Sequence, residues 1–454
     1  MPNLTQLRMA AREIFDEALR GVDAEEAVRR AVQLEDSRVN FCDAATVEIG
    51  DGRNIYSIAI GKAAAAMASA LDVILGNRLA AGVVAGNPPR SETAGERVKL
   101  SSRWQIFQGG HPEPNDQSLA AAQASFALLK HANEERALVI FLISGGGSAM
   151  IEWPINESIT LADLRAANKA LVNCGASISE INAVRRAFSA VKGGRLAARA
   201  PDCDQITLIV SDVPAGEERT VASGPTLTPA DDAPNALDVI ARYNLRAHLP
   251  ETILRALETE SKPDSEPTSL REHFVLVDNQ SALEAAGAAA GRQGFATEIA
   301  GDVSDQPIAE GCAQLLSRLN SLHERAKTQE SSQTNAACLI SGGEFACPVR
   351  GEGMGGRSLE TALRLASLRD LSLPDSGLFV AVCAGTDGID GNSPAAGAIV
   401  DNTTIHRARA IGLDPSDFIR RSDAYSFFIA LGDAIATGAT GTNVRDLRIL
   451  LSTA

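Results

Sequence analysis

The feature that most constrains the fold is a recurring succession of short apolar runs. Each run ends in a polar cluster rich in glycine, serine or aspartate, and most are followed by a helical pattern. Such runs, alternating with helices, are typical of a largely parallel sheet covered on both faces. Ligands of these sheets bind beyond the carboxyl ends of the strands, where the polar clusters fall. The sequence therefore predicts an α/β fold with strands at 55–60, 137–143, 206–210, 274–277, 337–340 and 378–383.

Length and composition predict two domains. The chain has 454 residues, of which 45% are hydrophobic, enough for two domains with substantial cores. A polar stretch at 259–271 predicts a linker, and another at 324–335 predicts a surface loop. We expect an N-terminal α/β domain over 1–265 and a C-terminal α/β domain over 270–454. Residues 7–32 have the pattern of one acidic, arginine-rich amphipathic helix.

Charge and cysteine usage limit the class of protein. The net charge of −15 and the pI near 5.0 argue against nucleic acid or an anionic membrane as the main partner. No apolar run reaches the roughly 18 residues of a membrane span, and the N-terminus lacks the pattern of a signal peptide. Seven scattered cysteines predict free thiols in a reducing compartment. We expect a cytoplasmic protein and leave open whether it forms a homodimer.

Two polar clusters in the N-terminal half are candidate anion sites. Lys62 follows Gly61 at the end of a predicted strand, where an ammonium and backbone N–H groups could meet a phosphate or carboxylate. The alternative is a solvated surface lysine. The second cluster lets the backbone approach an anion closely, although a plain tight turn is its alternative. It consists of Ser144, Gly145, Gly146, Gly147 and Ser148.

A group of cations follows these clusters. Asn182, Arg185 and Arg186 lie in a predicted helix that we expect to continue through Lys192 to Gly193-Gly194. One or two of these cations are expected to hold a substrate carboxylate or phosphate. The alternative is a solvated face near a helix C-terminus, which favours cations by itself.

Three more charged residues lie at the ends of predicted strands or helices: Asp212, Glu344 and Arg357. Asp212 ends an apolar run, where it could meet Mg²⁺ or a substrate hydroxyl, or form an Asx-turn before Pro214. Glu344 closes a Ser-Gly-Gly-Glu cluster in which the 337–340 run ends. Arg357 stands at the glycine-rich entrance of a predicted helix, a position that suits a bidentate grip on phosphoryl oxygens. The glycines could equally mark a flexible loop or lid.

The last clusters are acidic and polar. Thr386, Asp387 and Asp390 follow the 378–383 run, and the two aspartates fit the binding of a magnesium–nucleotide complex. Tight turns stabilised by aspartate are the alternative. The glutamate that closes a calcium-binding loop is missing, which argues against calcium. Residues 440–447 form a polar loop that we expect to lead into a final helix.

Together these segments resemble the glycerate 2-kinase family, the class II glycerate kinases with an N-terminal DUF4147 domain and a C-terminal MOFRL domain. The resemblance runs in the family's order over nearly the whole chain. One departure is Arg357-Ser358-Leu359-Glu360, where the family continues Gly-Gly-Arg with Asn-Gln-Glu. The matching segments are 61–65, 110–114, 144–148, 182–195, 211–214, 223–226, 341–344, 355–357, 384–391 and 440–447.

The resemblance implies a Rossmann-like N-terminal domain, a MOFRL region at about 335–450, and an active site in the cleft between the two domains. It implies transfer of the γ-phosphoryl group from ATP, with Mg²⁺, to the 2-hydroxyl of D-glycerate. Lys62 and Arg357 would be the main cations, and the 144–148 turn would bind phosphate. Asp212, Glu344, Asp387 and Asp390 would surround the metal and the reacting groups.

Three other functions remain open at the level of sequence. A hydroxypyruvate reductase would need a nicotinamide site, but no GxGxxG follows a strand with an acidic residue about twenty positions later. A non-catalytic binder of sugar acids or nucleotides is motivated by Ser358-Leu359. A kinase for a four-carbon aldonate is the third.

Overall fold

The computed structural model describes residues 3–50, 52–87, 100–258, 269–328, 336–372 and 377–453. Contacts divide the chain into two compact units: a first unit of residues 24–276, and a second unit of residues 1–23 and 277–454. This division differs from the expected 1–265 and 270–454, because the N-terminal segment belongs to the second unit and the first unit extends to Leu276. Residues 259–268 of the expected linker and 329–335 of the expected surface loop lie outside the described residues. Residues 324–328 of that expected loop are helical instead.

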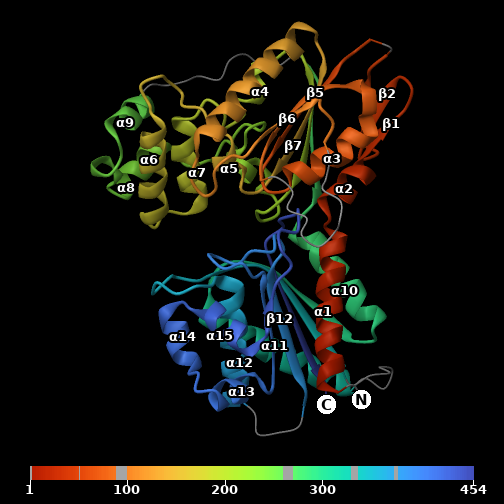
Figure 1. The fold of residues 1–454 in the computed structure, drawn as a ribbon, viewed down its shortest axis with the longest axis vertical. Coiled ribbons are helices and arrows are strands. Elements are labelled where there is room, and N and C mark those ends of the chain that lie inside the picture. Colours follow the sequence, from red (N-terminus) through yellow and green to blue (C-terminus); the bar gives the residue numbers. More distant parts are fainter. Residues whose placement is uncertain are drawn as a thin grey trace. The chain divides into compact units, whose positions relative to one another are not determined.

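The first unit is built on a six-stranded sheet. In spatial order its strands are β6 (Trp104–Phe107), β5 (Leu79–Ala85), β4 (Ile55–Ile60), β7 (Leu138–Ser144), β8 (Asp204–Val210) and β9 (Arg271–Val277). The pairs from β6 to β8 are parallel, which confirms a largely parallel sheet, although β5 and β6 are not among the strands expected from the sequence. Every residue of β4 and β7 is buried. The helices α3 (Ala64–Leu75) and α4 (Asp116–Glu134) contact these strands (Figure 1).

A group of short helices lies beside this sheet (Figure 1). It comprises α6 (Leu161–Asn173), α7 (Ile178–Ala187), α8 (Ala236–Arg242) and α9 (Glu251–Leu257), which share a separate hydrophobic core. The sequence predicts a helix that ends at Gly193-Gly194, and this end is wrong, because α7 ends at Ala187. The following backbone pairs with an extended segment instead: Ile155 N–H donates to Phe188 O at 2.9 Å, and Ala190 N–H donates to Trp153 O at 2.8 Å.

The remaining elements of the first unit are short. Helix α2 (Ala24–Ala31) leads into an antiparallel sheet of β1 (Val32–Leu34), β2 (Arg38–Phe41) and β3 (Ala45–Glu48). Helix α5 (Gly147–Met150) follows β7 directly. The described residues of this unit also contain the 3-10 segments η1 (Gly76–Arg78), η2 (Ala197–Arg199), η3 (Glu218–Ser223) and η4 (Leu245–Ala247).

The second unit holds a mixed six-stranded sheet. In spatial order its strands are β10 (Ala296–Pro307), β11 (Ala336–Ala346), β15 (Asp446–Thr453), β12 (Phe379–Gly385), β13 (Gly397–Asp401) and β14 (Ala434–Ile435). Among the described strands of this sheet, β10 and β11 are the one parallel pair. The final helix expected after 440–447 is wrong: this segment is β15, which is buried throughout and runs antiparallel to both β11 and β12.

Helices cover this second sheet. They are α10 (Asn279–Arg292), α11 (Ile308–Thr328), α12 (Arg357–Ser372), α13 (Thr404–Ala410), α14 (Pro415–Arg421) and α15 (Ala424–Leu431). Helix α1 (Leu4–Gly21) lies beside α10 and also contacts β12 (Figure 1). The single helix expected over 7–32 is therefore two helices, α1 and α2, in different units. Arg8 of α1 forms ion pairs with Asp401 and Asp433 of the second unit.

Two sequence-level expectations concern the whole chain. In the part of the chain that the structure describes, no helix is both long enough and apolar enough to cross a membrane. All seven cysteines are free thiols, four of them buried and three partly buried.

Candidate functional site

The ends of β4 and β7 are joined so that Lys62 lies against the glycine turn. Lys62 N–H donates to Gly145 O at 2.9 Å, and Ala63 N–H donates to Ser144 Oγ at 3.0 Å. Gly61 has a φ of +111°, and a Cβ there would come within 2.3 Å of Ser144 O, so only glycine fits this approach. The buried Ser144 hydroxyl also donates to Ile60 O at 3.1 Å. Ser144 therefore fixes the two strand ends to each other, which differs from the phosphate contact expected of it.

Three polar side chains surround the first two glycines of the turn. A Cβ on Gly145 would lie 1.7 Å from Asp212 Oδ2, so the Asp212 carboxylate rests directly on this glycine. A Cβ on Gly146 would lie 3.0 Å from Lys62 Cγ and 3.3 Å from His111 Cδ2. We call Lys62, His111, Asp212 and these glycines the lysine site. The structure thus brings together Lys62, Asp212 and the glycine turn, as the sequence predicts.

His111 is a member of this site that sequence reasoning missed, although it lies in the 110–114 segment of the family resemblance. Its loop is built tightly against α5 and the start of α4. A Cβ on Gly109 would come within 2.1 Å of Met150 O, and Gly110 N–H donates to Ser118 Oγ at 3.0 Å. The loop therefore holds His111 beside Lys62.

Ser148 and Asn182 meet through a third residue. Ser148 Oγ lies 2.8 Å from Ser223 Oγ, and Ser223 Oγ donates to Asn182 Oδ1 at 2.9 Å. Ser223 and Asn182 are buried, whereas Ser148 is half-buried. Asn182 therefore supports Ser148 through Ser223, and sequence reasoning did not foresee this link.

The predicted substrate cations Arg185 and Lys192 are engaged inside the first unit. Lys192 forms an ion pair with Glu152, and the two side chains are 1% and 2% exposed. Burial lowers the pKa of Lys192, against the opposing effect of Glu152. Arg185 Nε donates to Asn168 Oδ1 at 2.8 Å. Lys192 is buried and neutralised by Glu152, so the structure gives no support to the substrate contact expected of it.

A second site is centred on Arg357, the first residue of α12. Its Nε donates to Asp446 Oδ2 at 2.7 Å, and its Nη2 lies 2.9 Å from Glu344 Oε1. Burial alone would lower the pKa of the guanidinium, but Asp446 and Glu344 together raise it above its ordinary value. We call Arg357, Glu344, Asp446 and Asp387 the arginine site. Glu344 lies within β11, so this strand continues through the Ser-Gly-Gly-Glu cluster at which the apolar run was expected to end.

Asp390 caps α12 in the structure. Its Oδ1 accepts from Ser358 N–H at 3.0 Å and its Oδ2 accepts from Leu359 N–H at 2.7 Å. Burial raises the pKa of Asp390 to about 7, with a further contribution from Asp446. Both carboxylate oxygens thus position the helix that begins with Arg357, so the expected metal role of Asp390 is not supported. Leu359 is fully buried in the core, so its apolar side chain does not line an open site.

Thr386 and Asp387 differ in what they can do. The Thr386 hydroxyl is fully buried, donates to Arg445 O at 2.8 Å and accepts from Val444 N–H at 2.8 Å. It therefore ties β12 to the segment before β15, which leaves it no surface for a nucleotide. Asp387 is half-buried and its Oδ1 accepts from Ile389 N–H at 3.1 Å, as in an Asx-turn.

The donor set of the arginine site can be tested against Mg²⁺. The position of a Cβ on Gly385 lies 3.3 Å from Asp387 Oδ1 and 3.5 Å from Asp446 Oδ1, so two carboxylates converge over this glycine. Among the described residues, no three His, Cys, Asp or Glu side chains form a metal-holding group. Mg²⁺ in phosphotransferases is commonly held by one or two carboxylates together with substrate phosphates. Asp387 and Asp446 fit that requirement.

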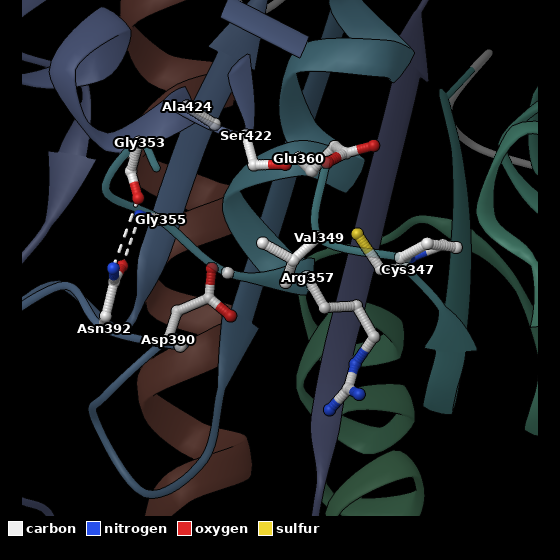
Figure 2. A pocket seen from close by; sticks show the side chains of 13 residues that line it. Cys347, Val349, Gly353, Gly355, Arg357, Glu360, Asp390, Asn392, Ser422 and Ala424 are labelled. Carbon is white, nitrogen blue, oxygen red and sulfur yellow. Dashed lines mark hydrogen bonds between the residues drawn. The ribbon is translucent and has the colours of Figure 1, made fainter. Parts of the chain in front are cut away.

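A pocket of about 360 Å³ opens beside the arginine site. Figure 2 shows Arg357, Asp390 and Asn392 on its wall, together with the glycine-rich segment before α12. Asn392 fixes this segment, because its Oδ1 accepts from Gly355 N–H at 2.8 Å and its Nδ2 donates to Gly353 O at 3.2 Å (Figure 2). The pocket therefore has an ordered wall of backbone and a cation at its edge.

Two further buried residues hold this region together. Arg448 is 1% exposed, donates to Gly342 O and to Gly343 O, and stacks 4.2 Å from the centre of the Phe345 ring. Asn279 Nδ2 donates to Val444 O at 2.7 Å and to Asp446 O at 3.2 Å. Sequence reasoning missed Asp446 and Arg448 as site residues. It left Asp446 unremarked in the polar loop expected over 440–447, and it placed Arg448 in the helix expected after that loop.

Comparisons with known proteins give matches over nearly the whole length of the chain. Two family models match: the domain of unknown function DUF4147 over residues 10–258, and the MOFRL family over residues 337–446. A protein of Agrobacterium vitis, provisionally named hydroxypyruvate reductase, is 36% identical over 99% of this chain and 95% of its own. The D-glycerate 2-kinase of Thermotoga maritima is 33% identical over 87% of this chain and 90% of its own. A crystal structure of a T. maritima glycerate kinase matches with a TM-score of 0.79 at 31% identity, over 98% of this chain and 99% of that one.

Proposed function

The chain belongs to the glycerate 2-kinase family, and from this premise we propose that it transfers the γ-phosphoryl group of ATP to the 2-hydroxyl of D-glycerate, giving 2-phosphoglycerate and ADP. The observation that carries the proposal is the lysine site. A cation and a carboxylate lie against one glycine turn at the carboxyl ends of parallel strands. A hydroxyl that attacks a phosphoryl group needs both kinds of group beside it.

In the proposed reaction Asp212 orients the 2-hydroxyl and accepts its proton. The hydroxyl oxygen forms a bond to the γ-phosphorus while the bond from that phosphorus to the β-phosphate oxygen breaks, and ADP leaves. Lys62 stabilises negative charge on the transferring group, since an ammonium beside the phosphoryl oxygens favours the transition state. His111, next to Lys62, adds a second polar group to this site.

The arginine site would serve the nucleotide. Asp387 and Asp446 would hold Mg²⁺, which neutralises phosphate charge and orients the phosphoryl group when bound. Glu344 and Asp446 fix the Arg357 guanidinium, so that its remaining N–H groups can meet phosphoryl oxygens. The neighbouring pocket, with its ordered glycine-rich wall, is the proposed place of the nucleotide.

A coupled assay of ADP formation tests this function with D-glycerate, four-carbon aldonates and other small hydroxy acids. We expect ATP- and Mg²⁺-dependent turnover that is fastest with D-glycerate. A parallel arm follows NADH absorbance with hydroxypyruvate, the reaction for which the A. vitis relative is named. Oxidation of NADH without ATP consumption would refute the proposal, and binding of acid and nucleotide without transfer would favour a non-catalytic binder.

Substitution of the two cations tests their roles. Lys62→Ala and Arg357→Ala should each lower kcat/KM by about a hundredfold or more, because each removes charge stabilisation that is strongest in the transition state. Lys130→Ala, which removes an exposed lysine of α4, is the matched control and should leave turnover unchanged. Near-normal turnover of both site variants would contradict these assignments.

A further inference from the structure

The hydrogen bonds behind the glycine turn have a defined direction. Ser223 has one hydroxyl proton and donates it to Asn182 Oδ1, an atom that can only accept. The 2.8 Å contact between Ser148 and Ser223 then needs Ser148 as its donor. Ser148 therefore directs its one proton inward, and its oxygen can only accept hydrogen bonds from anything bound at the site.

The backbone holds this arrangement in place. Ala222 and Ser223 have φ values of +52° and +62°, which residues with a side chain rarely adopt. Gly193 N–H donates to Ser223 O at 3.2 Å and Gly194 N–H donates to Gly224 O at 2.7 Å, which secures the segment. Strained conformations of this kind persist where the surroundings determine them and are frequent at functional sites. Ser223 is thus a fixed acceptor for the Ser148 proton.

An oxygen that only accepts is a poor ligand for an anion. A carboxylate or phosphoryl oxygen placed against Ser148 Oγ would meet lone pairs, so the expected phosphate contact of this hydroxyl is not supported. A hydroxyl group is the substrate feature that fits. Ser148 is half-buried in α5, the helix that begins right after Gly145 and Gly146, the two glycines that Asp212 and Lys62 contact.

We propose that Ser148 is a specificity-determining residue that accepts a hydrogen bond from the hydroxyl of the acid substrate that is not phosphorylated. This rests on the proposed function, in which the 2-hydroxyl of D-glycerate gives its proton to Asp212. The 3-hydroxyl is then the donor that remains for Ser148. A site built to pair with a hydroxyl discriminates against an analogue that lacks it, because the acceptor is left unpaired.

Calorimetric binding of D-glycerate and D-lactate tests this inference. D-lactate is D-glycerate with the 3-hydroxyl replaced by hydrogen. Ser148→Ala should weaken the binding of D-glycerate about tenfold and change that of D-lactate by less than about twofold. Ser223→Ala should reduce the preference for D-glycerate as well, because it releases the Ser148 proton. Ser158→Ala, which removes an exposed serine hydroxyl elsewhere in the first unit, is the control and should change neither affinity.

An equal loss of affinity for both acids in Ser148→Ala, or no loss for either, would overturn the inference. So would a wild-type protein that binds neither acid. The proposed function is judged separately, by ADP formation. A wild-type protein that prefers D-glycerate over D-lactate in binding but transfers no phosphate would contradict that function while supporting the role of Ser148.

Discussion

Individual residues of the right type are found at the expected strand ends, but their partners decide what they do. Lys62 and Asp212 share one turn, whereas Lys192 is paired with Glu152 in the interior. Nothing near Lys192 in the sequence marks Glu152 as its partner, because the two residues are 40 positions apart. The sequence therefore predicts where chemistry-bearing residues fall along the chain, but not which of them the fold neutralises.

Asp390 shows the same limit and gives a prediction. Burial raises its pKa to about 7, so the folded state keeps this carboxyl protonated at pH values where the unfolded chain ionises it. Its contribution to stability is complete below about pH 4, the ordinary pKa of aspartate, and is lost as the pH rises toward 7. Asp390→Asn should remove that part of the pH dependence, on the order of 1–4 kcal/mol in the free energy of unfolding.

Denaturant unfolding followed by circular dichroism at pH 4.5 and 7.5 measures this difference between wild type and variant. Glu352→Gln, at an exposed carboxylate of the same unit, is the control. If Asp390→Asn kept the pH slope of the wild type, the carboxyl could not be the buried group described here.

At the scale of elements, β4, β7 and β8 of the first sheet are predictable, because each is a local apolar run that ends in a polar cluster. Strands β5 and β6 of the same sheet were not expected from the sequence. Strand β15 is not predictable in this way. Its sequence from Asp446 to Thr453 alternates poorly, and its neighbours β11 and β12 are far from it along the chain. Since its side chains are buried, its apolar run is compatible with either a helix or a strand. Arg448 was missed because of this error, whereas Asp446 lies in the polar loop expected over 440–447 and was not singled out there.

The glycine turn after β7 gives a prediction at this scale. A Cβ on Gly145 would overlap the Asp212 carboxylate, so Gly145→Ala must displace one or the other. A displacement of about 1 Å at reacting groups can lower turnover about a hundredfold, and we expect a loss of that size in kcat/KM. Gly52→Ala is the matched control, because nothing lies within 4 Å of its Cβ position. Full activity of Gly145→Ala in the ADP assay would show that turnover does not depend on the present position of the Asp212 carboxylate.

At the scale of the whole molecule, the two units do not follow the order of the sequence, because both ends of the chain belong to the second unit. Helix α1 is the first element, yet its apolar face packs in the unit formed by residues 277–454. The sequence identifies α1 as amphipathic but contains no local sign of the surface that it covers. For the same reason β9, expected in the C-terminal domain, is an edge strand of the first sheet.

Phe15 tests this division. It is fully buried in α1, and Phe15→Ala should cost about 3–5 kcal/mol in the unit that α1 completes. Trp104 and Trp153 are the two tryptophans of the chain, and both belong to the first unit, so tryptophan fluorescence reports on that unit. In denaturant unfolding, we expect the transition seen by circular dichroism to move to a lower denaturant concentration. The transition seen by tryptophan fluorescence should not change. An equal shift of the fluorescence transition would contradict the assignment of α1 to the second unit alone.

The central claim is that this chain moves a phosphoryl group onto carbon 2 of glycerate with the help of Lys62 and Arg357. The most direct measurement is ³¹P and ¹H NMR of the product formed from ATP and D-glycerate by the wild type and by the two alanine variants. The account predicts 2-phosphoglycerate from the wild type and almost none from either variant in the same time. A phosphate on carbon 3, or the same yield of product from both variants, would contradict it.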